Sequence, residues 1–248
     1  MGAGTSADFE GRLSVVVPVK NEAQNVLPLV QEIHAALAPL ADFELIYIDD
    51  GSDDDTPQRL AEAARQFPRL RVVRHRQSCG QSAAVLSGVR AARHPWIATL
   101  DGDCQNDPAD LPKLLATLSP GQREPGLNLV IGWRTSRQDN AVRKLSSRIA
   151  NGVRGGLLGD RTPDTGCGLK VFSREVFLRL PFFDHMHRFL PALVLRDGGQ
   201  VRSVPVNHRP RPAGVSKYGI GNRLWVGIVD ICGVMWLNRR MKQPEIEA

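Results

Sequence analysis

The chain has 248 residues and carries 32 Lys and Arg against 26 Asp and Glu, which gives a net charge of +6. This length is enough for one large domain with a sizeable buried core. The basic balance favours anionic partners such as nucleotides or lipid head groups. Aromatic residues make up only 6% of the chain and are not interleaved with basic ones, which argues against a nucleic-acid partner.

The four cysteines are scattered along the chain and form no Cys-x-x-Cys pair. This pattern argues against a zinc site and a disulfide framework, and it fits a reducing compartment. Residues 1–10 lack the apolar segment of a secretory signal. We therefore expect a disordered lead and a cytoplasmic protein.

The first half of the chain alternates between two apolar patterns. Short apolar runs predict strands over residues 13–17, 43–48, 70–74, 96–100 and 129–131, and helical periodicity predicts helices over residues 26–37, 56–67, 81–92 and 110–118. Such alternation predicts a doubly wound α/β fold, with a mostly parallel central sheet flanked by helices.

The most informative segment follows the predicted strand 96–100, where one residue separates Asp101 from Asp103. In extended backbone, residues i and i+2 point to the same side, so both carboxylates can face one cation, with Gln105 as a further oxygen ligand. Mg²⁺ and Mn²⁺ prefer oxygen ligands, and Mg²⁺ is commonly held by carboxylates together with substrate phosphates. A turn formed by the aspartates is the alternative interpretation.

A second acidic strand end, Asp49 and Asp50, and a polar segment over residues 18–22 lie upstream. In α/β sheets, ligands bind outside the carboxyl ends of the strands. We therefore expect the three polar segments to converge on one crevice. Turn formation by Asp50 and helix capping by Glu22 are the alternatives.

The second half of the chain is more basic. Residues 134–158 predict a basic helix, and further patterns predict strands over 169–172 and 201–206 and helices starting at residue 173 and spanning 185–194.

The apolar stretch 224–237 is shorter than the roughly 20 residues of a membrane span and contains Asp230. Its flanking residues, Trp225, Trp236 and the basic segment after it, favour a helix in a membrane interface. Packing on the domain or on a dimer partner is the alternative.

Seven segments together carry a resemblance to a known family: VVVPVKNE (15–22), IDDGSDDDT (48–56), GQSAAVLSG (80–88), LDGDCQNDP (100–108), GWR (132–134), DTGCGLKVF (164–172) and RPAGVSKYG (211–219). In this order and spacing the chain resembles family 2 glycosyltransferases of the GT-A fold. It is most similar to the polyprenyl-phosphate sugar synthases, the dolichol-phosphate mannose synthase group. It departs from many bacterial relatives in lacking a multi-span C-terminal membrane region, and in having Cys104 and Cys167 where other small residues are usual.

The resemblance implies a GT-A domain over residues 11–218, with a nucleotide-binding half (11–134) and an acceptor half (135–218), followed by an interfacial or packing helix and tail (219–248). It implies metal-dependent, inverting transfer of a sugar from GDP-mannose or a UDP-hexose to a polyprenyl phosphate. The cofactor would be Mg²⁺ or Mn²⁺. The protein would act as a peripheral protein on the inner face of the cell membrane, with a homodimer as a further possibility.

Site residues follow from the same resemblance and from the chemistry of their side chains. The metal ligands would be Asp101, Asp103 and Gln105. The nucleotide-sugar site would comprise Pro18, Val19, Glu22, Asp49, Asp50, Gly80, Ser82, Asp101 and Arg211. The acceptor phosphate would bind Arg143 and Ser147, and the catalytic group would comprise Asp103, Arg134, Asp164 and Lys217. Arg134 is assigned to the diphosphate because a guanidinium matches phosphate oxygens. A packing role is the alternative for Gly80 and Ser82.

The acceptor decides whether a base is needed. A hydroxyl must lose a proton during attack and needs a positioned carboxylate or His, whereas a phosphate monoester is largely anionic at neutral pH. By the resemblance, relatives with hydroxyl acceptors carry their base in the segment matching residues 160–197, and the absence of a Glu-Asp pair there favours a phosphate acceptor. Asp164 remains the candidate for a base or for orienting the acceptor, with a tight turn at Asp164-Thr165-Gly166 as the alternative. The alternatives are a transferase of the same fold acting on a hydroxyl of a growing glycan, and a non-catalytic nucleotide-binding or membrane scaffold protein.

Overall fold

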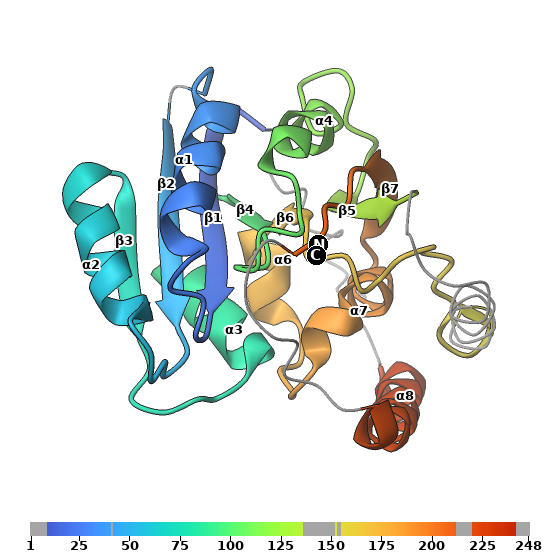
Figure 1. Ribbon diagram of the computed structural model, residues 1–248. Helices are drawn as coiled ribbons and strands as arrows, with labels where there is room; N and C mark the ends of the chain where they lie inside the picture. The colour runs from blue at the N-terminus through green and yellow to red at the C-terminus, as the bar shows by residue number, and fades with distance from the viewer. Residues whose placement is uncertain (1–8, 41, 136–151, 153–154, 212–219, 242–248) are drawn as a thin grey trace, which may run out of the picture.

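The computed structural model describes residues 9–40, 42–135, 152, 155–211 and 220–241, with the backbone alone at 220–225. A seven-stranded sheet in the order β3-β2-β1-β4-β6-β5-β7 forms its centre (Figure 1). The strands are β1 (Arg12–Val19), β2 (Asp42–Asp49), β3 (Leu70–Arg74), β4 (Trp96–Thr99), β5 (Leu127–Arg134), β6 (Lys170–Ser173) and β7 (Gln200–Val206). The helices are α1 (Val26–Leu37), α2 (Thr56–Gln66), α3 (Gln81–Ala91), α4 (Leu111–Ala116), α6 (Arg174–Arg179), α7 (Leu190–Arg196) and α8 (Ile220–Arg240), with short 3₁₀ turns η1 (Pro108–Asp110) and η2 (Met186–Arg188).

The sheet is mostly parallel, as the alternating pattern predicts. β1 pairs in parallel with β2 and β4, β2 with β3, and β5 with β7. β6 differs, because it runs antiparallel between β4 and β5. Its first residue, Lys170, pairs with Thr99, the last residue of β4, so β6 begins at the edge where the parallel strands end.

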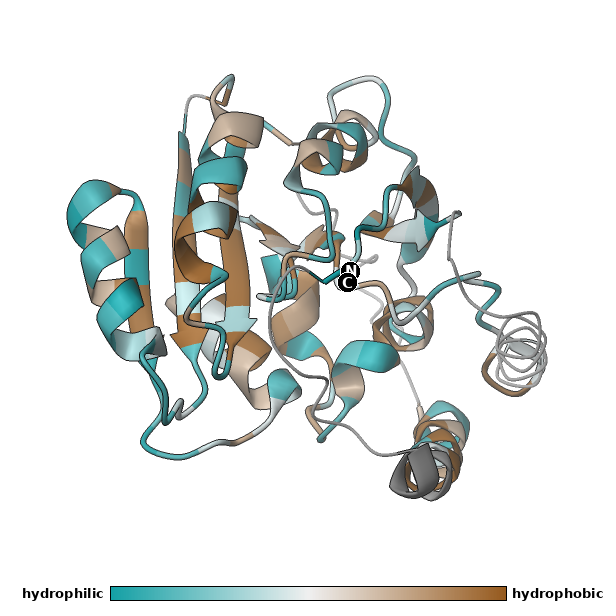
Figure 2. Ribbon diagram, viewed as in Figure 1, coloured by the Kyte–Doolittle hydropathy of each residue, from teal (hydrophilic) through white to brown (hydrophobic). Residues whose placement is uncertain are grey.

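Helices cover both faces of the sheet, and successive strand residues alternate between two cores. In β1, Val15 and Val17 pack with α1, α2 and α4, whereas Val16 packs with α3, α6 and α7. All three valines are fully buried. Burial on both faces explains why this strand is a continuous apolar run, and Figure 2 shows the central strands brown beneath the helices.

Most predicted elements lie within two residues of the observed ones, and α1 and β3 have the predicted bounds. The predicted helix 185–194 is instead two elements, η2 and α7. His185 has a left-handed φ of +66°, and Pro191 lies in the first turn of α7, where its missing N–H leaves no helical bond unmade. The predicted helix over 134–158 falls mainly outside the described residues, apart from a helical segment at 155–158.

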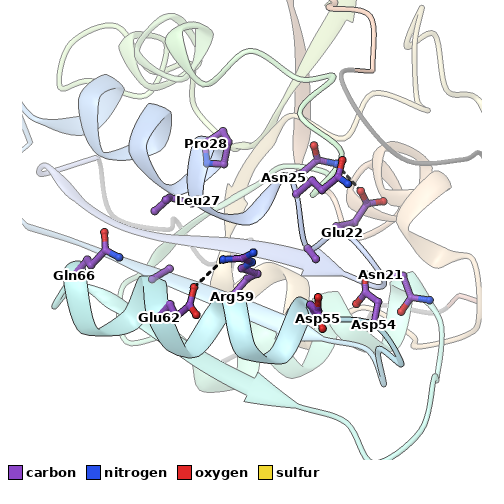
Figure 3. A pocket seen from close by; sticks show the side chains of 13 residues that line it. Asn21, Glu22, Asn25, Leu27, Pro28, Asp54, Asp55, Arg59, Glu62 and Gln66 are labelled. Atoms are coloured by element: carbon purple, nitrogen blue, oxygen red, sulfur yellow. Dashed lines mark hydrogen bonds and ion pairs between the residues drawn. The ribbon is translucent and has the colours of Figure 1, made fainter.

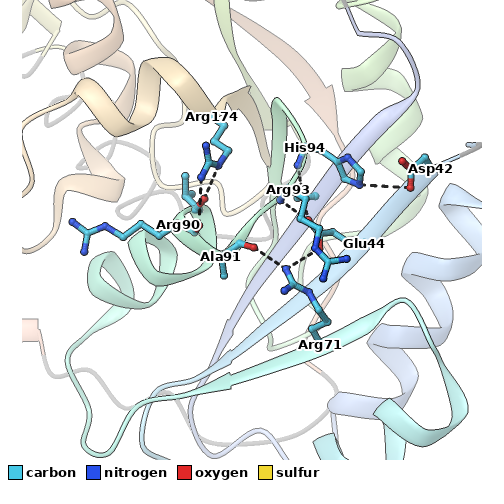
Figure 4. Close-up of polar contacts among 10 residues, drawn as sticks. Asp42, Glu44, Arg71, Arg90, Ala91, Arg93, His94 and Arg174 are labelled. Atoms are coloured by element: carbon cyan, nitrogen blue, oxygen red, sulfur yellow. Dashed lines mark hydrogen bonds and ion pairs between the residues drawn. The ribbon is translucent and has the colours of Figure 1, made fainter.

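A buried carboxylate ties the amino ends of the strands together (Figure 4). Glu44 in β2 accepts hydrogen bonds from Ser14 Oγ at 2.7 Å and from the backbone amide of Arg93 at 2.7 Å, and it pairs with Arg71 Nη2 at 2.8 Å. Burial raises the pKa of Glu44, but the hydrogen bonds from Arg93 and Ser14 and the charge of Arg71 outweigh it, so the pKa lies below its ordinary value.

Glu44→Gln should lower the free energy of unfolding by about 2 kcal/mol at pH 7, because hydrogen bonds to a charged group are lost. Since the folded-state pKa of Glu44 is lowered, its contribution is complete above the unfolded-state pKa and is lost as pH falls through the folded-state pKa. The difference between wild type and variant should therefore shrink below about pH 4. Urea unfolding at several pH values measures it. Glu62→Gln, which breaks only an exposed pair with Arg59, should change stability by less than about 1 kcal/mol and serves as the control. An equal loss in both variants would contradict this account.

Candidate active site

Three polar segments meet at the carboxyl ends of β1, β2 and β4, as the sequence predicts. The register places Val19 opposite Asp49, and the backbone amide of Asp50 donates to Val19 O at 2.9 Å. Gly102 packs directly against Val19: a Cβ added to Gly102 would lie 2.4 Å from Val19 Cγ1. Only glycine therefore allows the segment after β4 to pack this closely on the end of β1.

Asp101 and Asp103 lie in the turn that follows β4, and Cys104 beside them has a left-handed φ of +59°, so the predicted extended backbone is wrong and the turn alternative is confirmed. Gln81 Nε2 from the start of α3 donates to Asp101 Oδ1 at 2.8 Å, and the Asp101 amide donates to Asn106 Oδ1 at 3.2 Å. Asp103 Oδ1 accepts the backbone amide of Gln105 at 3.1 Å. Each carboxylate is thus held by a neighbour of its own.

The donor set of this turn fits a hard divalent cation. Burial and the charge of Asp103 raise the pKa of Asp101, although Lys170 and Arg134 oppose that rise. A cation bound between Asp101 and Asp103 would offset the repulsion between the two carboxylates. The groups available are two carboxylates and the side-chain carbonyl oxygen of Gln105. All are oxygen ligands, which Mg²⁺ and Mn²⁺ prefer.

The second acidic strand end is engaged with protein groups. Asp49 is fully buried, accepts the Ser52 amide at 2.9 Å and lies 3.0 Å from Arg74 Nε. Asp50 accepts four hydrogen bonds from the loop between β3 and α3, given by His75 Nδ1, Ser78 Oγ and the amides of Cys79 and Gly80 at 2.7–2.9 Å. Burial raises the pKa of Asp50, but these bonds outweigh it and hold the pKa below its ordinary value. Asp50 therefore shapes this loop at the ends of β2 and β3.

Ser82 and Gly80, at the start of α3, also have protein partners. Ser82 is buried and its Oγ lies 2.8 Å from His187 Nδ1 of η2. Gly80 has φ +88°, a conformation that favours glycine, and gives its amide to Asp50. These contacts link α3 to β2 on one side and to η2 on the other.

Arg134 and Asp164 form a bidentate ion pair. Arg134 Nε lies 2.6 Å from Asp164 Oδ2, and Arg134 Nη2 lies 2.8 Å from Asp164 Oδ1. The two side chains are only 13% and 9% exposed. Burial lowers the pKa of Arg134, but the Asp164 carboxylate raises it by more. The pKa therefore lies above its ordinary value and the guanidinium stays charged. The sequence assigned these residues separate roles, and the structure joins them.

The segment after β7 runs along the Asp101–Asn106 turn and reaches the start of α1. The Arg209 amide donates to Gln105 O at 3.0 Å, and the Arg209 side chain pairs with Glu32 at 2.6 Å. Arg211 pairs with Glu22, whose other oxygen accepts Asn25 Nδ2 at 2.6 Å. Two residues predicted to lie near the nucleotide are therefore in direct contact. Lys217, Arg143 and Ser147 lie outside the described residues.

Sequence reasoning missed Lys170, Gln81 and His187. They line a small cavity of about 20 Å³ together with Asp101 and the half-buried Pro18. That volume is close to the space of one water molecule. Burial lowers the pKa of Lys170, while interactions with Cys167, Asp101 and Asp164 act in the opposite direction. A lysine inside the predicted strand 169–172 was the signal available, because a charged residue in a buried strand needs a partner.

A larger groove of about 720 Å³ lies between α1 and α2 (Figure 3). Glu22 and Asn21 lie at the end nearest the crevice, and Arg59, Glu62 and Gln66 line the remainder. Asp101 and Asp103 are not among its lining residues. The groove therefore adjoins the candidate site without containing the acidic turn.

The family model described as "Glycosyl transferase family 2" matches residues 14–180. The chain is 39% identical over 237 residues to dodecaprenyl-phosphate galacturonate synthase of Rhizobium johnstonii, covering 94% of this chain and 69% of the relative. It is 31% identical to undecaprenyl-phosphate 4-deoxy-4-formamido-L-arabinose transferase of an Enterobacter species, covering 86% of this chain and 64% of that relative. This chain therefore belongs to glycosyl transferase family 2, a family of enzymes.

Among solved structures, the chain resembles glucosyl-3-phosphoglycerate synthase of Mycobacterium tuberculosis in complex with Mn²⁺ and uridine-diphosphate-glucose. The TM-score is 0.64 at 21% identity, covering 97% of this chain and 81% of that one. This likeness identifies the fold as GT-A. None of the described helices has the length and apolar character needed to cross a membrane.

Replacing Arg134 tests the buried ion pair. Arg134→Met removes the bidentate partner of Asp164 and should lower the free energy of unfolding by about 3 kcal/mol. Adding Asp164→Asn should restore much of that loss, because the buried carboxylate is then neutral. Denaturant unfolding of the two single variants and the double variant measures the coupling. Purely additive losses would show that the pair is not formed.

Proposed function

We propose that this protein transfers a sugar from a nucleotide diphosphate to a polyprenyl phosphate, with Mg²⁺ or Mn²⁺ bound by Asp101, Asp103 and Gln105. The relatives' names supply the acceptor class, since both act on a polyprenyl phosphate. The Mn²⁺ and UDP-glucose bound to the solved neighbour support the metal and the donor class.

The observation that favours a phosphate acceptor is the state of Asp164. Both of its carboxylate oxygens accept hydrogen bonds from Arg134, so they are engaged with a cation. A general base needs an oxygen directed at the proton it removes. A lipid phosphate is already largely ionised at neutral pH and can attack without such a base. Asp164 then serves to hold Arg134 rather than to remove a proton.

The chain's own residues would prepare the leaving diphosphate for departure. Gln81 fixes one oxygen of Asp101, and the Gln105 amide fixes one oxygen of Asp103. A divalent cation held there would supply Lewis-acid stabilisation of the negative charge on the leaving diphosphate. Arg134, oriented by Asp164, offers guanidinium donors suited to phosphate oxygens. Lys217, Arg143 and Ser147, which lie outside the described residues, would complete the proposed phosphate-binding set.

The donor nucleoside would lie along the ends of β1 and β2. Val19 and Asp49 are buried there, and Glu22 is held by Arg211 and Asn25. Asp50 would act on the nucleoside through the loop it organises, since its oxygens already accept hydrogen bonds from that loop. The base and the sugar, GDP-mannose or a UDP-hexose, are for the donor panel below to decide.

α8 supports a membrane-facing role. Val234 is fully buried, and Ile231 and Met235 pack on the core beside it. The opposite face exposes Val229 (55%) and Trp236 (59%). Arg239 and Arg240 are in the last turn of the helix. An apolar face with an indole and a basic end is typical of a helix lying in a bilayer interface, which here would bring the crevice to its lipid substrate at the cytoplasmic face.

Radiolabelled transfer from GDP- and UDP-sugars into polyprenyl phosphate tests the function. Wild type should give organic-phase label that disappears with a chelator and returns with Mg²⁺ or Mn²⁺. Asp103→Asn keeps the acceptor for the Gln105 amide but removes the charge, so it should lower the rate by about 100-fold.

Glu175→Gln is the matched control, because Glu175 is an exposed acid on α6. The proposal fails if no donor labels the lipid, or if label persists in the chelator and in Asp103→Asn.

Val229→Glu tests the membrane face. The substitution places a charge where Val229 would enter the lipid interface, and it should weaken binding to anionic phospholipid vesicles by about tenfold or more. Vesicle co-sedimentation measures the change. Val72→Glu is the control, since Val72 is an exposed apolar residue of β3. Equal binding by wild type and both variants would rule out α8 as the membrane contact.

A further inference from the structure

A second group of metal-binding side chains lies at the ends of β2 and β3, apart from the acidic turn. Asp50, His75 and Cys79 each offer a ligand atom, and these atoms lie within 4.8 Å of one another. We propose that these three residues bind a zinc ion, with a water as the fourth ligand. The proposal does not depend on the transfer reaction.

The ligand types distinguish this site from the acidic turn. One carboxylate, one imidazole and one thiol form a mixed set that suits Zn²⁺, whereas Mg²⁺ and Mn²⁺ favour oxygen ligands alone. Three protein ligands with one open position is an established zinc arrangement. The residues are 25 and 4 positions apart in sequence, so the Cys-x-x-Cys criterion, which argued against zinc, does not detect them.

Neighbouring groups hold the ligands. Without a metal, His75 Nδ1 donates a hydrogen bond to Asp50 Oδ1 at 2.7 Å, and His75 Nε2 lies 2.9 Å from Ser87 Oγ of α3. Zinc would displace the proton between His75 Nδ1 and Asp50, and Nε2 would then carry the ring proton and donate a hydrogen bond to Ser87 Oγ, which fixes both the tautomer and the ring. Zinc-bound histidines are usually supported in this way.

The carboxylate has the same kind of support. Asp50 Oδ2 accepts hydrogen bonds from Ser78 Oγ at 2.8 Å and from the Gly80 amide at 2.9 Å, and Oδ1, which faces His75, accepts the Cys79 amide at 2.8 Å. Asp50 is buried, His75 is half-buried and Cys79 is exposed. The ion therefore has a route from solvent through Cys79 to ligands that are already placed.

The loop is the part of the protein that zinc would affect. Cys79 lies immediately before Gly80 and α3, and Asp50 directly follows β2. A metal joining them would hold the loop between β3 and α3 against the sheet and raise the melting temperature, because it binds the folded state.

Spectroscopy on reduced, tag-free protein tests the site, with Co²⁺ as the probe and excess Mg²⁺ present to occupy oxygen-only sites. Wild type should show a thiolate-to-cobalt charge-transfer band that added Zn²⁺ removes. Cys79→Ser, which alters an exposed side chain, should lose the band while keeping its fold. Cys232→Ser is the matched control, because Cys232 is the other exposed cysteine among the described residues, and it should keep the band.

Competition with a chromophoric chelator gives the zinc affinity. His75→Asn should abolish tight binding, and Ser87→Ala should weaken it by about 10- to 100-fold through the loss of ring support. Absence of the band in wild type, or its survival in Cys79→Ser, would overturn the proposal. So would its loss in Cys232→Ser, since another cysteine would then hold the metal.

Discussion

The candidate active site depends on pairing each carboxylate at the strand ends with a basic side chain or a hydrogen-bond donor. Four or more acids gather where β1, β2 and β4 end, and buried negative charges repel unless they are offset. Arg134 offsets Asp164, Arg74 offsets Asp49, and the charge of Lys170 acts on Asp101. Burial and the charge of Asp103 still raise the pKa of Asp101, which is why we propose the divalent cation at the acidic turn.

The sequence predicted the fold well because both faces of the sheet are buried. Continuous apolar strands alternating with amphipathic helices leave few other arrangements, and α1 has the predicted bounds. The antiparallel β6 could not be predicted by alternation, since strand direction depends on where the chain re-enters the sheet. The split of the predicted helix 185–194 arises from Pro191 and a left-handed His185, a local conformation that periodicity does not reveal.

The site was predicted as a set of residues but not as a set of contacts. Convergence of Asp101 and Asp50 on one edge follows from parallel strands, and motif order indicated the remaining positions. The bidentate pair of Arg134 with Asp164 could not be predicted, because 30 residues separate the two in sequence and nothing in the pattern measures their distance. That pair is the reason we propose that Asp164 positions Arg134 and does not act as a base.

The most direct test of this account compares two acceptors that differ in one group. Polyprenyl phosphate and the corresponding free polyprenol are offered to the same protein with the same labelled donor, over a range of pH. The account predicts label in the polyprenyl phosphate alone, and a pH dependence of the transfer rate that shows no catalytic base on the protein. Efficient labelling of the free alcohol, abolished by Asp164→Asn, would contradict it and restore Asp164 as a catalytic base.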